Sequence, residues 1–133
     1  MHIIRLRGPW ELSRAGAAEA GVAHNLPATC AELQHAGLAG AIQAVRRFGL
    51  PTGLEAADVV SICLEGGPSE YTSVQFNGES LAPVRLDGGK PVIDITQRLQ
   101  PRNELALTFS LADLPPETLV GQVQLTISPT ISD

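Results

Sequence analysis

Short runs in which hydrophobic and polar residues alternate fill the C-terminal two-thirds of the chain. In one of them Thr72, Val74 and Phe76 fall on one side, and Ser73 and Gln75 fall on the other. Such a period of two is typical of β-strands with one buried face. The same pattern predicts strands at 58–64, 72–76, 84–86, 92–96, 104–110 and 119–127.

Turn residues separate these runs. Asn77-Gly78 directly follows one run and predicts a type I′ hairpin, because both central residues of that turn need a positive φ. Asp87-Gly88-Gly89 marks a second turn, and Pro115-Pro116 marks an exposed link. Short strands separated in this way are typical of an antiparallel β-sandwich or barrel.

The run 58–64 differs from the others because neither of its sides is strongly polar. Its odd-numbered side carries Val59, Ser61 and Cys63, and its even-numbered side carries Val60, Ile62 and Leu64. A strand with this composition is expected to be covered on both faces.

The first third of the chain has a weaker pattern. Ile4 and Leu6 alternate with arginines, which predicts a strand that ends near Gly8-Pro9-Trp10. Residues 29–48 allow two interpretations. Hydrophobic residues at 38, 42 and 45 have the spacing of an amphipathic helix, but the glycines at 37 and 40 would each cost a helix about 1 kcal/mol relative to alanine. The alternative is a loop up to residue 40 followed by a strand over 41–48.

No internal repeat, low-complexity stretch or linker divides the 133 residues. A chain of this length usually forms one domain, so we expect a single β-sandwich domain over 1–133.

The order of strands and turns resembles a known family. The sequence is similar to the N-terminal, sugar-binding-type jelly roll of glycoside hydrolase family 2, which belongs to the galactose-binding-like β-sandwiches. The similarity extends over roughly residues 3 to 127. It rests on five ordered pieces: Gly8-Pro9-Trp10, Arg46-Arg47-Phe48-Gly49-Leu50-Pro51, Val74-Gln75-Phe76-Asn77-Gly78, Asp94-Ile95-Thr96 with Leu99, and Asn103-Glu104-Leu105.

This resemblance implies an antiparallel jelly-roll sandwich, and it favours the strand over 41–48. In family 2 enzymes the module is an accessory domain, and the catalytic carboxylates lie in a separate (β/α)₈ barrel. The chain ends soon after the predicted sandwich, so the resemblance implies a module without glycosidase activity. Fold alone does not decide function, because such sandwiches serve many ligands.

Charge and hydropathy exclude two classes of partner. The 14 acidic and 9 basic residues give a formal net charge of −5, and no segment concentrates basic residues as binding to a phosphate backbone requires. No apolar run approaches the ~20 residues that cross a bilayer. The first ten residues lack the apolar core of a secretory signal. We expect neither a nucleic-acid nor a membrane partner, and a cytoplasmic location provided that the chain is complete.

The residues that most often carry chemistry form no recognisable motif. Cys30 and Cys63 are too few for a disulfide framework and lack the Cys-x-x-Cys spacing of a metal site, so they are expected to be small buried hydrophobes. His24, Cys30 and His35 could supply three zinc ligands, but their spacings match no closed zinc site. No nucleophile elbow or phosphate-binding loop is present. We therefore expect no catalytic residue, no metal and no cofactor.

Two aromatic residues are the candidate ligand contacts. Phe48, Phe76 and Phe109 are expected in the core, which leaves Trp10 and Tyr71 to stack on a sugar. Trp10 follows a predicted strand end, where it either caps the core or forms a platform. Tyr71 falls on the polar side at the start of a strand.

Two polar residues near 95 have a structural explanation. We expect Thr96 to cap a helical turn over 97–99 and Asp94 to accept local backbone N–H groups.

Two functions from different classes follow. The first is a non-catalytic module that binds a saccharide through Trp10 or Tyr71. The second is a protein–protein interaction or homo-oligomeric assembly module, which the low aromatic content of 4% favours. A homodimer is one expected form, because isolated sandwiches have open sheet edges to protect.

Overall fold

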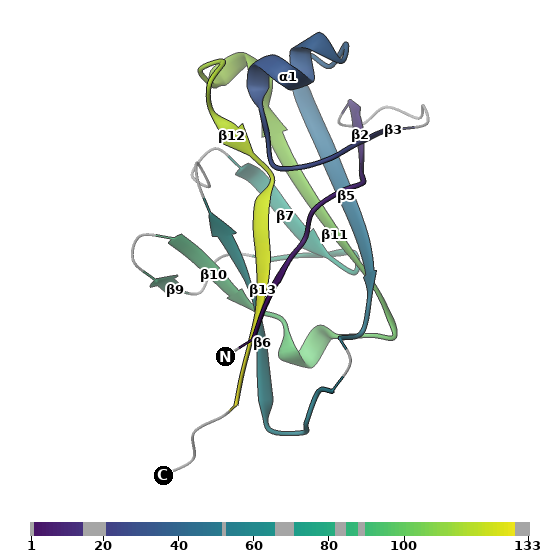
Figure 1. Ribbon diagram of the computed structural model, residues 1–133, viewed down its shortest axis with the longest axis vertical. Coiled ribbons are helices and arrows are strands. Elements are labelled where there is room, and N and C mark those ends of the chain that lie inside the picture. The colour runs from purple at the N-terminus through teal and green to yellow at the C-terminus, as the bar shows by residue number, and fades with distance from the viewer. Residues whose placement is uncertain are drawn as a thin grey trace.

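The computed structural model describes residues 2–14, 21–51, 53–65, 71–81, 85–87 and 90–129. Two antiparallel sheets form the body of the fold (Figure 1). In spatial order, the five-stranded sheet contains β1 (His2–Arg5), β13 (Gln122–Pro129), β6 (Asp58–Glu65), β10 (Lys90–Asp94) and β9 (Arg85–Asp87). The six-stranded sheet contains β3 (Val22–His24), β2 (Trp10–Arg14), β5 (Ala41–Gly49), β11 (Arg102–Ser110), β7 (Tyr71–Phe76) and β8 (Glu79–Ser80).

The remaining elements are short. A two-stranded sheet pairs β12 (Leu119–Val120) with β4 (Ala28–Thr29), and the helix α1 (Cys30–His35) directly follows β4. Figure 1 shows α1 and β12 together at one end of the fold. Two single 3₁₀ turns, η2 (Thr96–Arg98) and η3 (Leu111–Asp113), flank β11. This arrangement confirms the predicted all-β, antiparallel sandwich.

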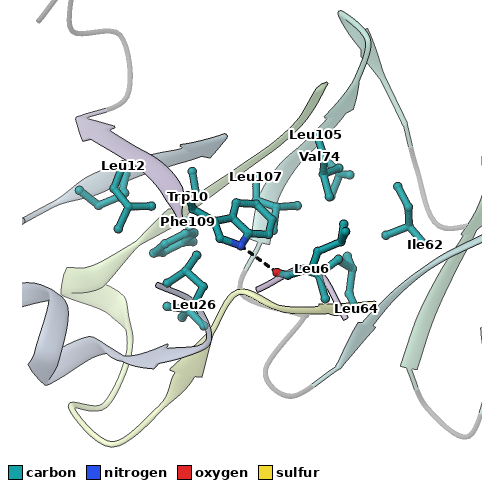
Figure 2. Packing of buried hydrophobic residues seen from close by; sticks show 14 of the residues in the cluster. Leu6, Trp10, Leu12, Leu26, Ile62, Leu64, Val74, Leu105, Leu107 and Phe109 are labelled. Atoms are coloured by element: carbon teal, nitrogen blue, oxygen red, sulfur yellow. Dashed lines mark hydrogen bonds between the residues drawn. The ribbon is translucent and has the colours of Figure 1, made fainter. Parts of the chain in front are cut away.

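The hydrophobic core lies between the two large sheets. The five-stranded sheet contributes Ile62 and Leu64 from β6, and the six-stranded sheet contributes Leu105, Leu107 and Phe109 from β11 (Figure 2). The inward residues follow the period of two that the sequence shows. Phe76 and Phe109 are fully buried, as predicted, and Phe48 packs against the core with its ring centroid 6.1 Å from that of Phe76.

Strand β6 is buried on both faces, as its composition predicts. Val60, Ile62 and Leu64 face the core, while Ser61 and Cys63 are also buried on the opposite face. β6 lies between β13 and β10 in the middle of its sheet. A central strand of this kind explains why neither of its sides is strongly polar.

The Asn77-Gly78 turn joins β7 to β8 as predicted. Asn77 has a φ of 52° and Gly78 has a φ of 85°, so both central residues adopt the left-handed conformation. A type I′ turn requires this pair of conformations and matches the twist of the two strands.

Residues 29–48 contain both of the structures that the sequence left open. Thr29 caps α1 by accepting a hydrogen bond from the Glu32 N–H at 3.2 Å. The helix ends at His35, because Gly37 and Gly40 take positive φ values of 92° and 73° that a helix cannot contain. The chain then forms β5, so the strand over 41–48 is confirmed and the long helix is wrong.

The predicted capping role of Thr96 is wrong. Thr96 lies inside the turn η2, and its hydroxyl instead accepts a hydrogen bond from the Val60 N–H at 2.9 Å. Asp94 Oδ1 accepts the Thr96 backbone N–H at 2.9 Å, as predicted. Thr96 therefore ties η2 to β6 and does not cap a helical turn.

Candidate functional site

Trp10 belongs to the core. Its exposed fraction is 0%, and its Nε1 donates a hydrogen bond to the carbonyl oxygen of Leu6 at 2.9 Å. Figure 2 shows the ring among Leu6, Leu107 and Phe109, with the indole nitrogen pointing at that oxygen. A side chain without an exposed face offers nothing on which a sugar ring could stack. Of the two roles that the sequence left open, the structure places Trp10 in the first, a residue of the core.

Tyr71 begins β7, and its backbone lies opposite Phe109 of β11 where the register shifts. Its side chain lies outside the described residues. Strands β5 and β11 separate β2 from β7, so the backbones of Trp10 and Tyr71 lie at least ~14 Å apart across the sheet. The structure does not bring the two predicted contact residues together.

A pocket of about 590 Å³ lies over the end of the β5–β11 pair. Arg47, Phe48 and Gly49 line it from β5, and residues 101–104 line it from the start of β11. In the strand register Gly49 lies opposite Arg102, and Arg47 lies opposite Glu104. The pocket therefore spans the last rungs of two central strands of the sheet.

Arg47 is held between two carboxylates on the outer face of the sheet. Its Nε lies 3.1 Å from Glu104 Oε2 on β11, and its Nη1 lies 3.5 Å from Glu11 Oε2 on β2. The side chains of Arg47 and Glu104 are 62% and 48% exposed. Exposed ion pairs contribute little to stability. Their effect here is to orient a guanidinium and a carboxylate at the rim of the pocket.

Gly49 lines the pocket without a side chain that would enter it. An added Cβ at Gly49 would meet only the Pro101 carbonyl oxygen, at the ordinary contact distance of 3.8 Å. Across from it, the exposed Arg102 forms no ion pair with the described part of the chain. The hollow is thus a glycine gap between two arginine side chains, with a carboxylate beside it.

A hydrogen-bond network centred on the Asn103 side-chain amide fixes the backbone that lines the pocket. Asn103 is only 2% exposed, and its Oδ1 accepts hydrogen bonds from the Gln100 N–H at 2.9 Å and from Asn77 Nδ2 at 3.2 Å. Its Nδ2 donates to the carbonyl oxygens of Gln100 at 2.9 Å and Phe48 at 3.5 Å. A buried amide whose oxygen and nitrogen are both fully hydrogen-bonded fixes the backbone around it.

Asn77 extends this network to a second turn. Its Oδ1 accepts the Glu104 N–H at 2.8 Å, and its Nδ2 donates to the Arg98 carbonyl oxygen at 3.0 Å. The hairpin turn, the η2 region and the start of β11 therefore form one unit next to the pocket.

The outer face of the six-stranded sheet continues away from the pocket as a polar surface. The paired positions Ser13–Gln43, Gln43–Thr108 and Thr108–Ser73 form one row of hydroxyl and amide groups across four strands. All four side chains are half-buried. This surface carries hydrogen-bonding groups but no described aromatic side chain.

Neither a metal centre nor a membrane-spanning helix is visible in the described ranges. Among those residues no three His, Cys, Asp or Glu side chains lie together as metal ligands. Cys30 and Cys63 are both buried, as the sequence predicts. No helix there is long and apolar enough to cross a membrane.

Sequence reasoning missed the residues that line the pocket. Arg47, Gly49, Arg102 and Glu104 come from two strands more than 50 residues apart in sequence. The sequence signal that could have pointed to these residues is a charged residue on the outward side of each strand. Only the register of β5 against β11 shows that these positions meet.

Comparisons with known proteins identify the fold. No protein-family model matches the chain, and no curated protein matches it in sequence. Among solved structures it is similar to an FMN-binding β-glucuronidase from Faecalibacterium prausnitzii L2-6, with a TM-score of 0.70 and 21% identity over 96% of this chain and 22% of that one. A β-glycosidase from Bacteroides vulgatus gives a TM-score of 0.67 and 21% identity over 97% and 20% of the two chains.

A third solved structure carries the family name. A glycosyl hydrolase family 2 member from Bacteroides cellulosilyticus DSM 14838 matches with a TM-score of 0.68 and 14% identity over 97% of this chain and 21% of that one. At such identities the likeness shows the fold, and this chain spans only about a fifth of each of the three enzymes. The chain therefore has the β-sandwich fold of one segment of the family 2 glycosidases, as the resemblance in its sequence implied.

Proposed function

We propose that this chain is a non-catalytic module that binds a carbohydrate and works beside a glycosidase catalytic domain. The observation that carries the proposal is the pocket of about 590 Å³ that Arg47, Gly49, Arg102 and Glu104 line. Its volume falls in the range of about 300–1,000 Å³ that small-molecule sites occupy. The solved structures that share the fold are glycosidases, and this supports a carbohydrate as the ligand.

The pocket has the hydrogen-bonding chemistry that a sugar needs. A guanidinium donates two parallel hydrogen bonds to neighbouring hydroxyl oxygens, and a carboxylate accepts from hydroxyl groups. Arg47 and Glu104 are already oriented by their ion pair, so binding costs less side-chain entropy than it would for free side chains. Tyr71 lies opposite Phe109, toward the other end of β11, so it remains a separate proposed ligand contact outside this pocket.

The test is a thermal-shift and calorimetric screen of mono- and oligosaccharides against the wild type and Gly49→Val. Valine projects three carbon atoms into the hollow without strain, because its Cβ has space and β-branched residues suit strands. A saccharide at 100 times its Kd stabilises the wild type by about 2.7 kcal/mol, which is a shift of several degrees. We expect Gly49→Val to abolish this shift while leaving the unliganded melting temperature unchanged or higher.

Ala41→Val is the matched control. It adds the same side chain at the other end of the same strand, at an exposed position far from the pocket. Binding that survives Gly49→Val would overturn the assignment of the pocket. If Tyr71→Ala alone abolished saccharide binding, the binding site would instead be assigned to the start of β7.

A second candidate function is an interaction module. The chain corresponds to about a fifth of each of the three enzymes, and this favours a role that depends on contact with other domains. A homodimer is the simplest such assembly. A mass of 14 kDa from light scattering at high protein concentration would exclude the homodimer.

A further inference from the structure

A second, smaller pocket lies where β1 separates from β13. Its volume is about 70 Å³. The paired strands end at Arg5, which lies opposite Gln124, and the Leu6 N–H makes one more bond to the Val123 carbonyl oxygen at 3.0 Å. Beyond that point the chain turns toward β2, and a gap opens between the two segments. The pocket is on the five-stranded sheet, whereas the proposed carbohydrate site is on the six-stranded one.

The walls of this pocket are rich in hydrogen-bond donors. Arg5 and Arg7 line one side, and Gln122 and Gln124 line the other. Leu6 and Val123, which alternate with them, are buried in the core. The period of two therefore directs Arg5, Gln122 and Gln124 to the same face of the sheet, and Arg7 lines the same pocket just past the end of β1.

The positive charge at this pocket is not neutralised within the described ranges. Neither Arg5 nor Arg7 forms an ion pair there, and no acidic residue lines the pocket. Arg46 reaches this segment from β5, where its Nε donates to the Arg7 carbonyl oxygen at 2.8 Å, but it does not line the pocket. Arg5 and Arg7 thus place two unneutralised charges at one pocket in a chain whose net charge is −5.

We propose that this pocket binds one small oxyanion group, a carboxylate or a phosphate, through Arg5, Arg7 and Gln122. Guanidinium forks match the geometry of both anions and make charge-assisted hydrogen bonds with them. The volume of about 70 Å³ equals the liquid volume of roughly two water molecules, which suits one oxyanion group and excludes a sugar ring. The proposal stands independently of carbohydrate binding.

The experiment is an NMR titration of the ¹⁵N-labelled protein with sodium acetate and with sodium phosphate. Sodium chloride at constant ionic strength is the reference. We expect saturable shifts of the Arg5 and Arg7 Nε–Hε signals and of the Gln122 side-chain amide. Arg7→Gln should raise the Kd about tenfold or more, because one charge-assisted hydrogen bond is lost.

Arg98→Gln is the control, since it removes the same charge from an exposed arginine on η2 away from this pocket. Unchanged backbone spectra establish that both variants are folded. Saturation by acetate alone identifies a carboxylate ligand, and tighter saturation by phosphate identifies a phosphorylated one. Shifts that grow linearly, that chloride reproduces, or that Arg98→Gln weakens as much as Arg7→Gln would overturn the proposal.

Discussion

Replacing Trp10 by phenylalanine removes one buried hydrogen-bond donor and part of one ring from the core. The Leu6 carbonyl oxygen then loses the donor that lies 2.9 Å away, in a place where neither residue is more than 3% exposed. An orphaned buried acceptor costs about 1–3 kcal/mol. The smaller ring leaves a cavity of roughly 40 Å³, which adds about 1 kcal/mol. We expect a total loss of roughly 2–4 kcal/mol.

The assay is urea and thermal unfolding followed by circular dichroism. For a domain of this size the loss corresponds to a fall in melting temperature of roughly 6–20 °C. Phe76→Leu is the matched control, because it shrinks another fully buried ring without removing a donor, at a cost of about 1–1.5 kcal/mol. The excess loss in Trp10→Phe measures the orphaned acceptor.

The wild type offers an independent check, since the chain contains one tryptophan. Its fluorescence should be blue-shifted, resistant to acrylamide and unchanged by saccharides. An emission maximum typical of indole in water, together with a loss below about 1 kcal/mol in Trp10→Phe, would refute the reasoning. A saccharide that quenches this emission would restore Trp10 as a ligand platform.

Three further predictions concern the scaffold. Asn103→Ala should lower the free energy of unfolding in urea by about 2–4 kcal/mol, because several partners of the buried amide lose their hydrogen bonds. A loss below about 1 kcal/mol would mean that water replaces the amide. Gly121→Ala should cost about 2–5 kcal/mol, since φ is 77° and the new methyl would lie 2.4 Å from a leucine methyl. Gly37 has a φ of 92° and open space around an added Cβ, so Gly37→Ala should cost only about 1–2 kcal/mol in the same urea assay. Equal costs for Gly121→Ala and Gly37→Ala would contradict the steric argument. Cys30 and Cys63 should react with a thiol reagent only on unfolding, and rapid labelling of the native protein would contradict their burial.

Local rules were enough to predict much of the fold from the sequence. Asn77-Gly78 specifies its turn because almost no other dipeptide places two residues at positive φ without cost. The predicted strand 58–64 indicates its central place because residues 59–64 carry no charge on either side. These features depend on near neighbours in the chain, and a sequence displays them directly.

Residues 29–48 show where local rules fail. The apolar spacing that favours a helix is real, but Gly37 and Gly40 divide the segment into a short helix and a long strand. Nothing in the spacing of Leu38, Ile42 and Val45 shows that the last two belong to a strand paired with β11. Tertiary pairing overrides the local preference.

The candidate site was harder to predict for the same reason. Arg47 and Glu104 read separately as solvated charges, and only the register of β5 against β11 makes them a pair. Trp10 allowed two interpretations because it follows Gly8-Pro9 at a predicted strand end, and the structure shows that it begins β2 with its side chain buried in the core. Aromatic residues beside turns are ambiguous until the packing around them is known.

The pairing of β1 with β13 has a consequence for how the chain folds during synthesis. β1 leaves the ribosome before the other strands of this fold, but in the described sheet its partner is β13, whose residues 122–129 emerge more than 100 residues later. Until then the edge of β1 is open, and Ile3 and Ile4 have no strand beside them. A contact of such long sequence separation slows folding and exposes an apolar strand to aggregation. Shortening the chain before residue 122 should therefore leave a protein that aggregates, even though the six-stranded sheet is complete by residue 110.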